Sequence, residues 1–465
     1  MINELKEMED QESNSGVDFG GLLEGLNIPY ERYENHLTVG ETGHDNGWAV
    51  FVSVNSHQLK DLLSDIALEL FDLKVPFRII KNEGIAERVN NFWYGIHEVG
   101  RSITIYTGKQ EVTETVIQRL SPLTDKYLGP QVLDTVRVEK VLYVSYLVFQ
   151  EQKGDDEEVK WKFALNVPSI KKFPFKINDK YKYWKRKRLL KKRFVPLVLI
   201  SRSPKGDLLK AIDIKGFRFD WCFVKEGKSN VFIDRHGRDI SDRFKWQKRL
   251  LKELQDDVPM PRFVDYFEQD EECYLVMEYL EGISLSEKIE KIHSNRKWDD
   301  LLFSEQQQLI VYFLQAVDIL RRMHKKGYVH RDATASNFMI LPGGKLYTID
   351  LELSFNLNTN EPLWPFSLGS FGYISPEQAR VEQPTIKEDV YSVGALLLFT
   401  WTGHHPSYFI DLNHEINMSK LEESISNKKV LNLVLKCLSH LPEDRPGLNE
   451  VEQEIASMLS TKHIV

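Results

Sequence analysis

Val329-His330-Arg331-Asp332-Ala333-Thr334-Ala335-Ser336-Asn337 is the stretch that decides the fold of the second half of this chain. It has the pattern H-R-D-x-x-x-x-N, and thirteen residues after Asn337 comes Asp350. This spacing suits phosphoryl transfer, in which one carboxylate orients or deprotonates a hydroxyl nucleophile while an amide oxygen and a second carboxylate hold Mg²⁺ on nucleotide phosphates. We therefore predict Asp332 as the catalytic base, and Asn337 and Asp350 as the metal ligands.

Segments ahead of this loop supply the other parts of a nucleotide site. Trp221-Cys222-Phe223-Val224-Lys225 resembles the V-A-I-K strand, so Lys225 is the expected catalytic lysine that pairs with the phosphates. Strands expected over 195–200 and 208–214 flank a turn at 203–207, where a phosphate cover belongs. The predicted nucleotide-binding residues are Gly206, Lys225, Met277, Glu278, Tyr279, Leu280, Asn337 and Asp350, and the expected cofactors are Mg²⁺ and ATP or another nucleoside triphosphate.

Further motifs follow in the order of a protein kinase, and the resemblance to that fold runs from 194 to about 460. A helix over 243–254 should carry a glutamate for Lys225, but Gln247 stands at that position and Glu253 lies one to two turns later. A second helix over 304–325 opens with a capping-box spacing. Downstream matches are Leu368–Gln378, Asp389–Gly394 and Cys437–Pro446, which should contain a structural ion pair between Glu377 and Arg445.

The first half alternates predicted strands and helices, which favours an α/β domain over about 36–150. Strands are expected at 48–54, 76–80, 102–106 and 141–149, and helices at 57–71, 83–93 and 111–120. The charged segment 150–158 reads as a loop. Nine of the fourteen residues 180–193 are basic. They indicate a solvated helix face, a dock for an acidic peptide segment or a nucleic-acid contact, the last of which the acidic net charge disfavours.

The composition limits the partners, the cysteine chemistry and the cellular compartment that we expect for this protein. The 465 residues carry a formal net charge of −8, which argues against nucleic acid as a partner. Three widely separated cysteines give neither a zinc-ligand spacing nor a disulfide framework. There is no apolar run of about 18 residues and no signal-peptide pattern, so we expect a cytoplasmic protein without a membrane span.

Two details of the catalytic segments narrow the resemblance. Thr334 stands where Ser/Thr protein kinases have lysine, and Asp350-Leu351-Glu352 replaces the usual D-F-G. Both features resemble class III lanthipeptide synthetases. The first half is also similar to the phosphoserine/phosphothreonine lyase domain of that family, in Gly47–Ser53, Val75–Arg78, Gly100–Tyr106, Leu128–Pro130, Pro168 and Pro174-Phe175. The family phosphorylates Ser/Thr of a ribosomally made precursor peptide, eliminates the phosphate and cyclises the product with Cys.

The resemblance implies an α+β protein with an N-terminal α/β phosphothreonine-lyase-like domain and a bilobal kinase-like domain. We predict a loosely ordered N-terminus over 1–35, the lyase-like domain over 36–178, a basic linker over 179–193 and the kinase-like domain over 194–465. The third domain of the family, a zinc cyclase, has no counterpart before Val465, so a separate cyclase is the expected partner.

The lyase-like pocket departs from the family pattern. Phe51 aligns with a histidine, Arg78 with a lysine and Ser145 with a phosphate-binding arginine. Phe51 cannot donate a proton, and Arg78 stays charged at neutral pH and is a poor base. Each missing acid or base is worth roughly 10²–10⁴ in rate, unless Lys81, His57 or His97 replaces it. Phe51, Arg78, Arg101 and Arg137 therefore form a predicted pocket for a phosphopeptide or an acidic leader.

The sequence thus predicts a Mg-nucleotide-dependent Ser/Thr kinase that acts on a precursor peptide in lanthipeptide-like biosynthesis, with a degenerate lyase domain used for recognition and a separate lyase where needed. Two alternatives stay open. One is a bifunctional kinase–lyase that dehydrates Ser/Thr. The other is a non-catalytic scaffold that binds the precursor peptide and partner enzymes.

Overall fold

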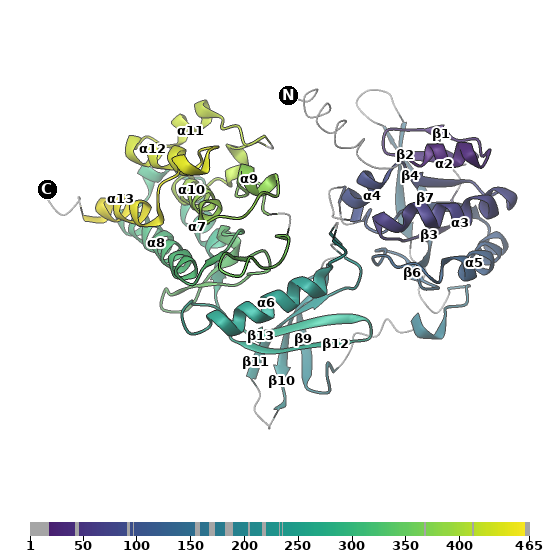
Figure 1. The fold of residues 1–465 in the computed structure, drawn as a ribbon, viewed down its shortest axis with the longest axis horizontal. Helices are drawn as coiled ribbons and strands as arrows, with labels where there is room; N and C mark the ends of the chain where they lie inside the picture. Colours follow the sequence, from purple (N-terminus) through teal and green to yellow (C-terminus); the bar gives the residue numbers. More distant parts are fainter. Residues whose placement is uncertain are drawn as a thin grey trace. The chain divides into compact units, whose positions relative to one another are not determined.

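A computed structural model (Figure 1) describes residues 18–41, 46–90, 94–95, 97–153, 159–166, 173–181, 189–202, 205–215, 220–231, 233–234, 236–366, 369–411 and 413–460. Several sequence predictions lie outside these ranges: the first 17 residues, residues 154–158 of the loop predicted over 150–158, Pro168, the basic residues 182–188, positions 203–204 of the expected phosphate cover, and Leu368. The loop prediction is wrong for 150–153, which belong to strand β7 (Leu142–Lys153). The chain divides into two units, Met1–Leu209 with Lys225–Ser241 and Glu268–Cys273, and Lys210–Val224 with Asp242–Phe267 and Tyr274–Val465.

The first unit is built on an eight-stranded sheet with the strand order β1-β2-β4-β5-β3-β7-β6, in which β8 pairs with β7. The neighbouring pairs are antiparallel. The strands are β1 (Glu31–Arg32), β2 (His36–Val39), β3 (Gly47–Val52), β4 (Phe77–Ile80), β5 (Ile103–Gly108), β6 (Val136–Arg137), β7 (Leu142–Lys153) and β8 (Val159–Asn166). Four of them confirm predicted strands. The strand order and the antiparallel pairing were not predicted, because alternation along the chain does not specify neighbours in a sheet.

One face of this sheet carries the core. Helix α3 (Leu59–Asp72) buries the stripe that its periodicity predicts, and packs with α5 (Gln110–Thr124) against alternate residues of β3 and β5 such as Val50 and Ile103. Figure 1 shows α3 lying across β3, with α4 (Glu83–Asn90) and the short α2 (Gly20–Gly25) nearby. The opposite face, which includes Phe51 and Tyr143, has only a small apolar cluster. That face is therefore the one open to polar chemistry.

The second half begins with a five-stranded sheet of order β12-β13-β11-β10-β9 and a helix, α6 (Ile240–Leu254), drawn in teal in Figure 1. The strands are β9 (Phe194–Ser201), β10 (Leu208–Asp213), β11 (Asp220–Gly227), β12 (Phe263–Gln269) and β13 (Glu272–Glu278). Each strand and helix predicted here is present. The arrangement puts Lys225 near the end of the central strand, β11.

The helical part is organised around α8 (Phe303–Lys325) and α10 (Ile386–Thr402). Helix α10 is buried on all sides, and its first turn contains Glu388 and Asp389. The other helices are α7 (Leu285–His293), α9 (Pro376–Ala379), α11 (Met418–Ser424), α12 (Lys428–Cys437) and α13 (Leu448–Ser460). Short strands frame the catalytic segments: β14 (Ile283–Ser284), β15 (Tyr328–Val329), β16 (Phe338–Ile340), β17 (Leu346–Thr348) and β18 (Phe355–Asn356).

The predicted capping box at Ser304 and Gln307 is wrong. Helix α8 begins at Phe303, and the Glu305 carboxylate accepts a hydrogen bond of 2.9 Å from the Leu302 N–H. Arg296 donates to both oxygens of the same carboxylate, at 3.0 and 2.9 Å. This ion pair fixes Glu305 in the first turn and starts the helix before Ser304. In the described parts of the chain, we find no helix whose length and apolar character would let it cross a membrane.

Candidate active site

The catalytic loop is held from behind by one carboxylate. Asp389, fully buried in the first turn of α10, accepts the backbone N–H groups of His330 and Arg331, each at 2.8 Å. His324 lies 2.7 Å from the same group. Burial opposes ionisation, but the hydrogen bonds from His324 and the backbone win and hold the pKa of Asp389 below its ordinary value. The loop is therefore anchored by an ionised group inside the protein.

Asp332 projects from this loop with its carboxylate already oriented. Asn337 Nδ2 donates to Asp332 Oδ2 at 2.7 Å and to its carbonyl at 2.8 Å. On the other side, the Ser370 hydroxyl donates to Oδ1 at 2.9 Å and the Ser370 N–H at 3.3 Å. Burial raises the pKa of Asp332, against these hydrogen bonds. A partly buried carboxylate held in this way can accept the proton of a substrate hydroxyl.

Sequence reasoning missed Ser370. Its only signal was its place in Leu368–Gln378, and the contact with Asp332 spans 38 residues. The Ser370 hydroxyl therefore donates to one of the two carboxylate oxygens of the predicted catalytic base.

His330 is a structural residue. Its Nε2 lies 2.8 Å from Thr348 Oγ1, and the Asp332 N–H donates to its Nδ1 at 3.3 Å. Burial lowers the pKa of His330, so the imidazole is neutral with its proton on Nε2. It fixes the backbone of Asp332 without adding a charge beside it.

The two predicted metal ligands are joined through the backbone. The Ile349 N–H donates to the Asn337 carbonyl at 2.9 Å, which places Asp350 two residues after the end of β17, beside the catalytic loop. The Asn337 amide nitrogen is used on Asp332, so its side-chain oxygen is the atom suited to a cation. An amide oxygen and a carboxylate are hard ligands, and they fit the divalent metal that kinase chemistry requires.

The predicted nucleotide residues lie on β11, β13 and the segment that follows. Lys225 is buried on β11, and Met277 is buried near the end of β13. Glu278, Tyr279 and Leu280 are half-buried. The Glu278 N–H donates to the Arg262 carbonyl at 2.9 Å, so this donor is already used within the protein.

Gly206 has a local structural role in the turn between β9 and β10. Its φ of +146° and its close approach to the Glu226 carbonyl leave no room for a Cβ atom. Asp207 and Glu226 exchange hydrogen bonds at the same point. This glycine therefore lets the turn lie on β11, whatever it also contributes to phosphate binding.

The middle of α6 carries no carboxylate for Lys225. Gln247 stands at the expected position and is fully buried, which an uncharged side chain tolerates better than a carboxylate would. Glu253 accepts hydrogen bonds from Arg249 Nε, at 2.7 Å, and from the hydroxyl of Tyr328 on β15. Its carboxylate is therefore already paired.

Two buried ion pairs brace the helical part. Arg445 donates to both oxygens of Glu377, at 2.5 and 2.8 Å, which confirms the predicted pair. The second pair was not predicted: Arg331 Nε donates to Glu388 Oε2 at 2.8 Å, and both side chains are fully buried. Arg331 Nη1 also donates to the carbonyls of Leu353 and Phe366. This arginine thus ties the segment after Asp350 to α10.

The lyase-like pocket lies on the open face of the first sheet. The strand registers align Arg78, Thr104, Phe51 and Tyr143 in one row across four strands. Arg101 lies 5.3 Å above the Phe51 ring and is 8% exposed. Its Nη1 is 3.5 Å from Glu98, whereas its Nε and Nη2 have no hydrogen-bond partner within the described ranges. Burial, with the neighbouring Arg78 charge, lowers the pKa of Arg101.

Arg137 is directed to other contacts. Its Nε and Nη2 donate to the Lys140 carbonyl at 3.0 and 2.7 Å, and its guanidinium lies 4.0 Å from the Tyr181 ring and 4.0 Å from Glu271. Arg137 nevertheless belongs to the same row, because it is the register partner of Tyr143 and its guanidinium lies 5.9 Å from the Tyr143 ring centroid. That Phe51, Arg78, Arg101 and Arg137 form one pocket stays a prediction. Ser145, where the family has an arginine, donates to the Asp134 carbonyl at 3.1 Å.

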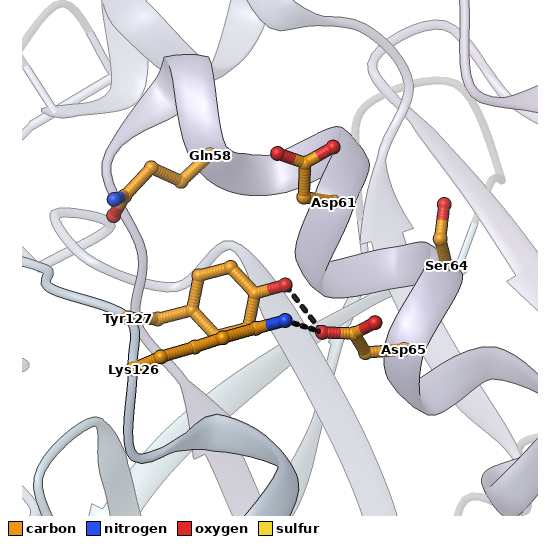
Figure 2. Close-up of a pocket in the computed structure, with 6 residues that line it drawn as sticks. All are labelled: Gln58, Asp61, Ser64, Asp65, Lys126 and Tyr127. Carbon is orange, nitrogen blue, oxygen red and sulfur yellow. Dashed lines mark hydrogen bonds and ion pairs between the residues drawn. The ribbon is translucent and has the colours of Figure 1, made fainter.

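A separate surface pocket of about 470 Å³ lies beside α3 (Figure 2), lined by Gln58, Asp61, Ser64, Asp65, Lys126 and Tyr127. Figure 2 shows both the Tyr127 hydroxyl and the Lys126 ammonium on Asp65, at 2.6 and 2.7 Å. These charged groups therefore pair with one another in the wall of the pocket. None of the residues that line this pocket is a predicted site residue.

Comparison with known proteins agrees with this geometry. Residues 248–455 match the family model described as "Protein kinase domain", and residues 33–181 match "RamC, N-terminal domain". Similar curated proteins include serine/threonine-protein kinase B of Synechocystis, 25% identical over 53% of this chain and 43% of its own length. Human serine/threonine-protein kinase Nek10 is 28% identical over 50% of this chain and 20% of its own length. For PrkC of Bacillus subtilis these values are 28%, 51% and 34%.

Residues 248–455 thus form a protein kinase domain similar to those of Ser/Thr kinases, a kind of domain that uses ATP and a divalent metal, and a RamC-like domain precedes it. The chain spans less than half the length of each of these relatives.

Proposed function

We propose that this protein uses Mg-nucleotide to phosphorylate Ser/Thr residues of a ribosomally made precursor peptide, in a lanthipeptide-like pathway in the cytoplasm. The observation that carries the proposal is the pairing of an oriented Asp332 with a RamC-like domain on the same chain. RamC-like domains are associated with lanthipeptide formation, which makes a small peptide a better candidate substrate than a folded protein.

In this reaction Asp332 accepts the hydroxyl proton as the substrate oxygen attacks the terminal phosphorus of the nucleotide. Asn337 and Asp350 would hold the metal, which neutralises charge on the phosphates. Lys225 would anchor the phosphates, and the segment from Met277 to Leu280 would hold the base. The distances around Asp332 support its part in this assignment.

The RamC-like domain would recognise the peptide through an anionic group. A buried guanidinium with two donor atoms aimed away from protein acceptors favours an anion, and Arg78 adds a second positive charge. Phe51 provides no proton. We therefore assign this pocket to holding phosphoserine or phosphothreonine, or an acidic leader segment, with elimination and cyclisation carried out by separate enzymes.

A second candidate is the bifunctional kinase–lyase. The observation that favours it is the pair of His97 Nδ1 and Asp134 Oδ2, 2.9 Å apart, with Asp134 close enough to act electrostatically on Arg101. A histidine oriented by a carboxylate can take the Cα proton while phosphate leaves.

Intact-mass spectrometry of a precursor peptide, incubated with the protein, Mg²⁺ and ATP, separates these functions. A stable gain of about 80 Da per site, one phosphoryl group, supports the proposal. A loss of about 18 Da per site, one water, would replace it with the bifunctional enzyme. An unmodified peptide with untouched nucleotide would leave the scaffold as the function.

A further inference from the structure

Ser354 lies where the turn after the predicted metal ligand Asp350 meets the catalytic loop. Its N–H donates to the Leu351 carbonyl at 3.1 Å, which closes this turn. At the start of the turn, the Glu352 N–H donates to Asp350 Oδ1 at 3.3 Å. The Ser354 hydroxyl donates to the His330 carbonyl at 3.2 Å, so the turn is also bound to the catalytic loop. The carboxylate of Asp350 is therefore oriented by a turn whose far end is Ser354.

Helix α6 supplies another contact of Ser354. The indole Nε1 of Trp246, on α6, donates to the Ser354 carbonyl at 2.7 Å. Trp246 is 7% exposed and Ser354 is fully buried, so solvent competes little for this hydrogen bond. The next residue, Gln247, is uncharged and cannot form the ion pair that is expected of this helix. A neutral hydrogen bond to the backbone therefore links α6 to the turn after Asp350.

Two further residues of α6 contact the neighbouring segments at less buried points. Arg249 Nη1 donates to Glu361 at 2.8 Å, and both side chains are exposed. Glu253 accepts a hydrogen bond from the hydroxyl of Tyr328 on β15. The partners in these two contacts lie outside the turn that carries Asp350. Since loss of a donor to a buried carbonyl costs more than loss of an exposed ion pair, the turn depends most on the indole of α6.

We propose that Trp246 is a positioning residue for the catalytic metal, because it holds the turn that orients Asp350 through the Ser354 carbonyl. Groups behind a metal ligand set its orientation, and their loss typically costs about 10–100-fold in metal affinity. The indole acts on the metal site without touching the metal. This inference rests on the proposed function, in which Asp350 binds Mg²⁺ on the nucleotide.

The test measures the dissociation constant of the full chain for ATP by isothermal titration calorimetry, in EDTA and at a series of Mg²⁺ concentrations. In the wild type, Mg²⁺ should strengthen ATP binding. Trp246→Phe keeps an aromatic ring but removes the N–H donor, so we expect this strengthening to fall by about tenfold. The dissociation constant in EDTA should stay close to that of the wild type, because Asp350 acts through the metal.

Ser354→Ala is a second variant, which removes the hydroxyl that binds the turn to the catalytic loop. It should weaken the effect of Mg²⁺ in the same direction, and it replaces Trp246→Phe if that variant does not fold. Trp298→Phe is the matched control. Trp298 is also 7% exposed, and its ring stacks on Trp401 with 3.8 Å between the ring centroids. In this control, Mg²⁺ should strengthen ATP binding as much as in the wild type.

Two results overturn the positioning role and leave the proposed function standing. One is an undiminished effect of Mg²⁺ in Trp246→Phe, or in Ser354→Ala where the tryptophan variant does not fold. The other is an equal loss in Trp298→Phe, which would show that any missing buried indole weakens the metal site. A wild type that binds ATP equally with and without Mg²⁺, or binds no ATP, overturns the proposed metal site and this inference with it.

Discussion

At the scale of single residues, the centre of the kinase site is a carboxylate whose two oxygens have different partners. Asp332 Oδ2 faces an amide that also binds the loop backbone, and Oδ1 faces a serine of a distant segment. Neutralising this carboxylate removes the proton acceptor but keeps the shape of the side chain.

We therefore expect Asp332→Asn to lower the rate of peptide phosphorylation by about 10²–10⁴. Nucleotide affinity should change little, because the lost group acts on the hydroxyl. Rates and nucleotide dissociation constants are measured on the same preparation, with Ser336→Ala, an exposed change in the same loop, as the control. A rate within threefold of the wild type, roughly 0.6 kcal/mol in barrier, would contradict the role of Asp332.

Arg101 is the second residue that carries a prediction. A buried guanidinium with unpaired donors lowers the stability of the free protein, so Arg101→Met should raise the free energy of unfolding by about 1–3 kcal/mol while abolishing stabilisation by inorganic phosphate. Urea unfolding with and without phosphate measures both effects.

Arg119→Met serves as the control, because it removes an exposed arginine from α5 in the same domain. This control should lower stability slightly and keep the response to phosphate. Loss of stability in Arg101→Met, with the phosphate response intact, would count against the anion pocket.

At the scale of elements, the Arg331–Glu388 pair connects the catalytic loop, the segment after Asp350 and the first turn of α10. Burial raises the pKa of Glu388 to about 7, against the attraction of Arg331, and Asp389 and Glu377 push it in the same direction as burial. The carboxyl thus binds its proton more tightly in the folded chain than in the unfolded chain.

A carboxyl with a raised pKa stabilises the fold fully below its unfolded value of 4.5, and this contribution is lost as pH rises toward about 7. We expect the free energy of unfolding to fall over this window, by about 1–3 kcal/mol from this group. Glu388→Gln should flatten that slope. Chemical unfolding of both proteins at half-unit pH steps measures it, and parallel slopes would show that Glu388 does not titrate there.

The elements also show where sequence reasoning succeeds. Local periodicity located α3, β3, β4 and β5 within a few residues, since burial of one face follows from short-range pattern. Motif spacing predicted the Glu377–Arg445 pair. The capping of α8 was missed because Arg296, outside the helix, decides it.

Details of the site that depend on tertiary packing could also not be predicted from the sequence. The contact of Ser370 with Asp332 and the Arg331–Glu388 pair each join residues far apart in the chain. Spacing along a sequence gives the type of a side chain, but which acceptor an arginine reaches is set by the folded surroundings.

At the scale of the whole molecule, the predicted metal ligands and the predicted anion pocket fall in different units, and the predicted phosphate lysine Lys225 falls in the first. The predicted Mg-nucleotide ligands Asn337 and Asp350 lie in the second unit, and the Arg78–Arg101 pocket lies in the first. Chains with more than one cooperative region unfold in separable steps.

Calorimetry should therefore show two transitions, each with its own ligand. Mg-ATP at one hundred times its dissociation constant should stabilise one region by about 2.7 kcal/mol, and inorganic phosphate should stabilise the other. Asp350→Ala should remove the response to Mg-ATP and keep the response to phosphate. A single transition that both ligands shift equally would contradict separate sites.

The carboxylate opposite Arg331 has one more consequence. Kinases that await a signal leave a cationic site for a phosphate, whose arrival orders the activation loop. Here Glu388 of the same chain already pairs with that arginine and is fully buried with it. The enzyme should leave the ribosome ready to work, so its output would follow the supply of peptide and nucleotide instead of a command from another kinase.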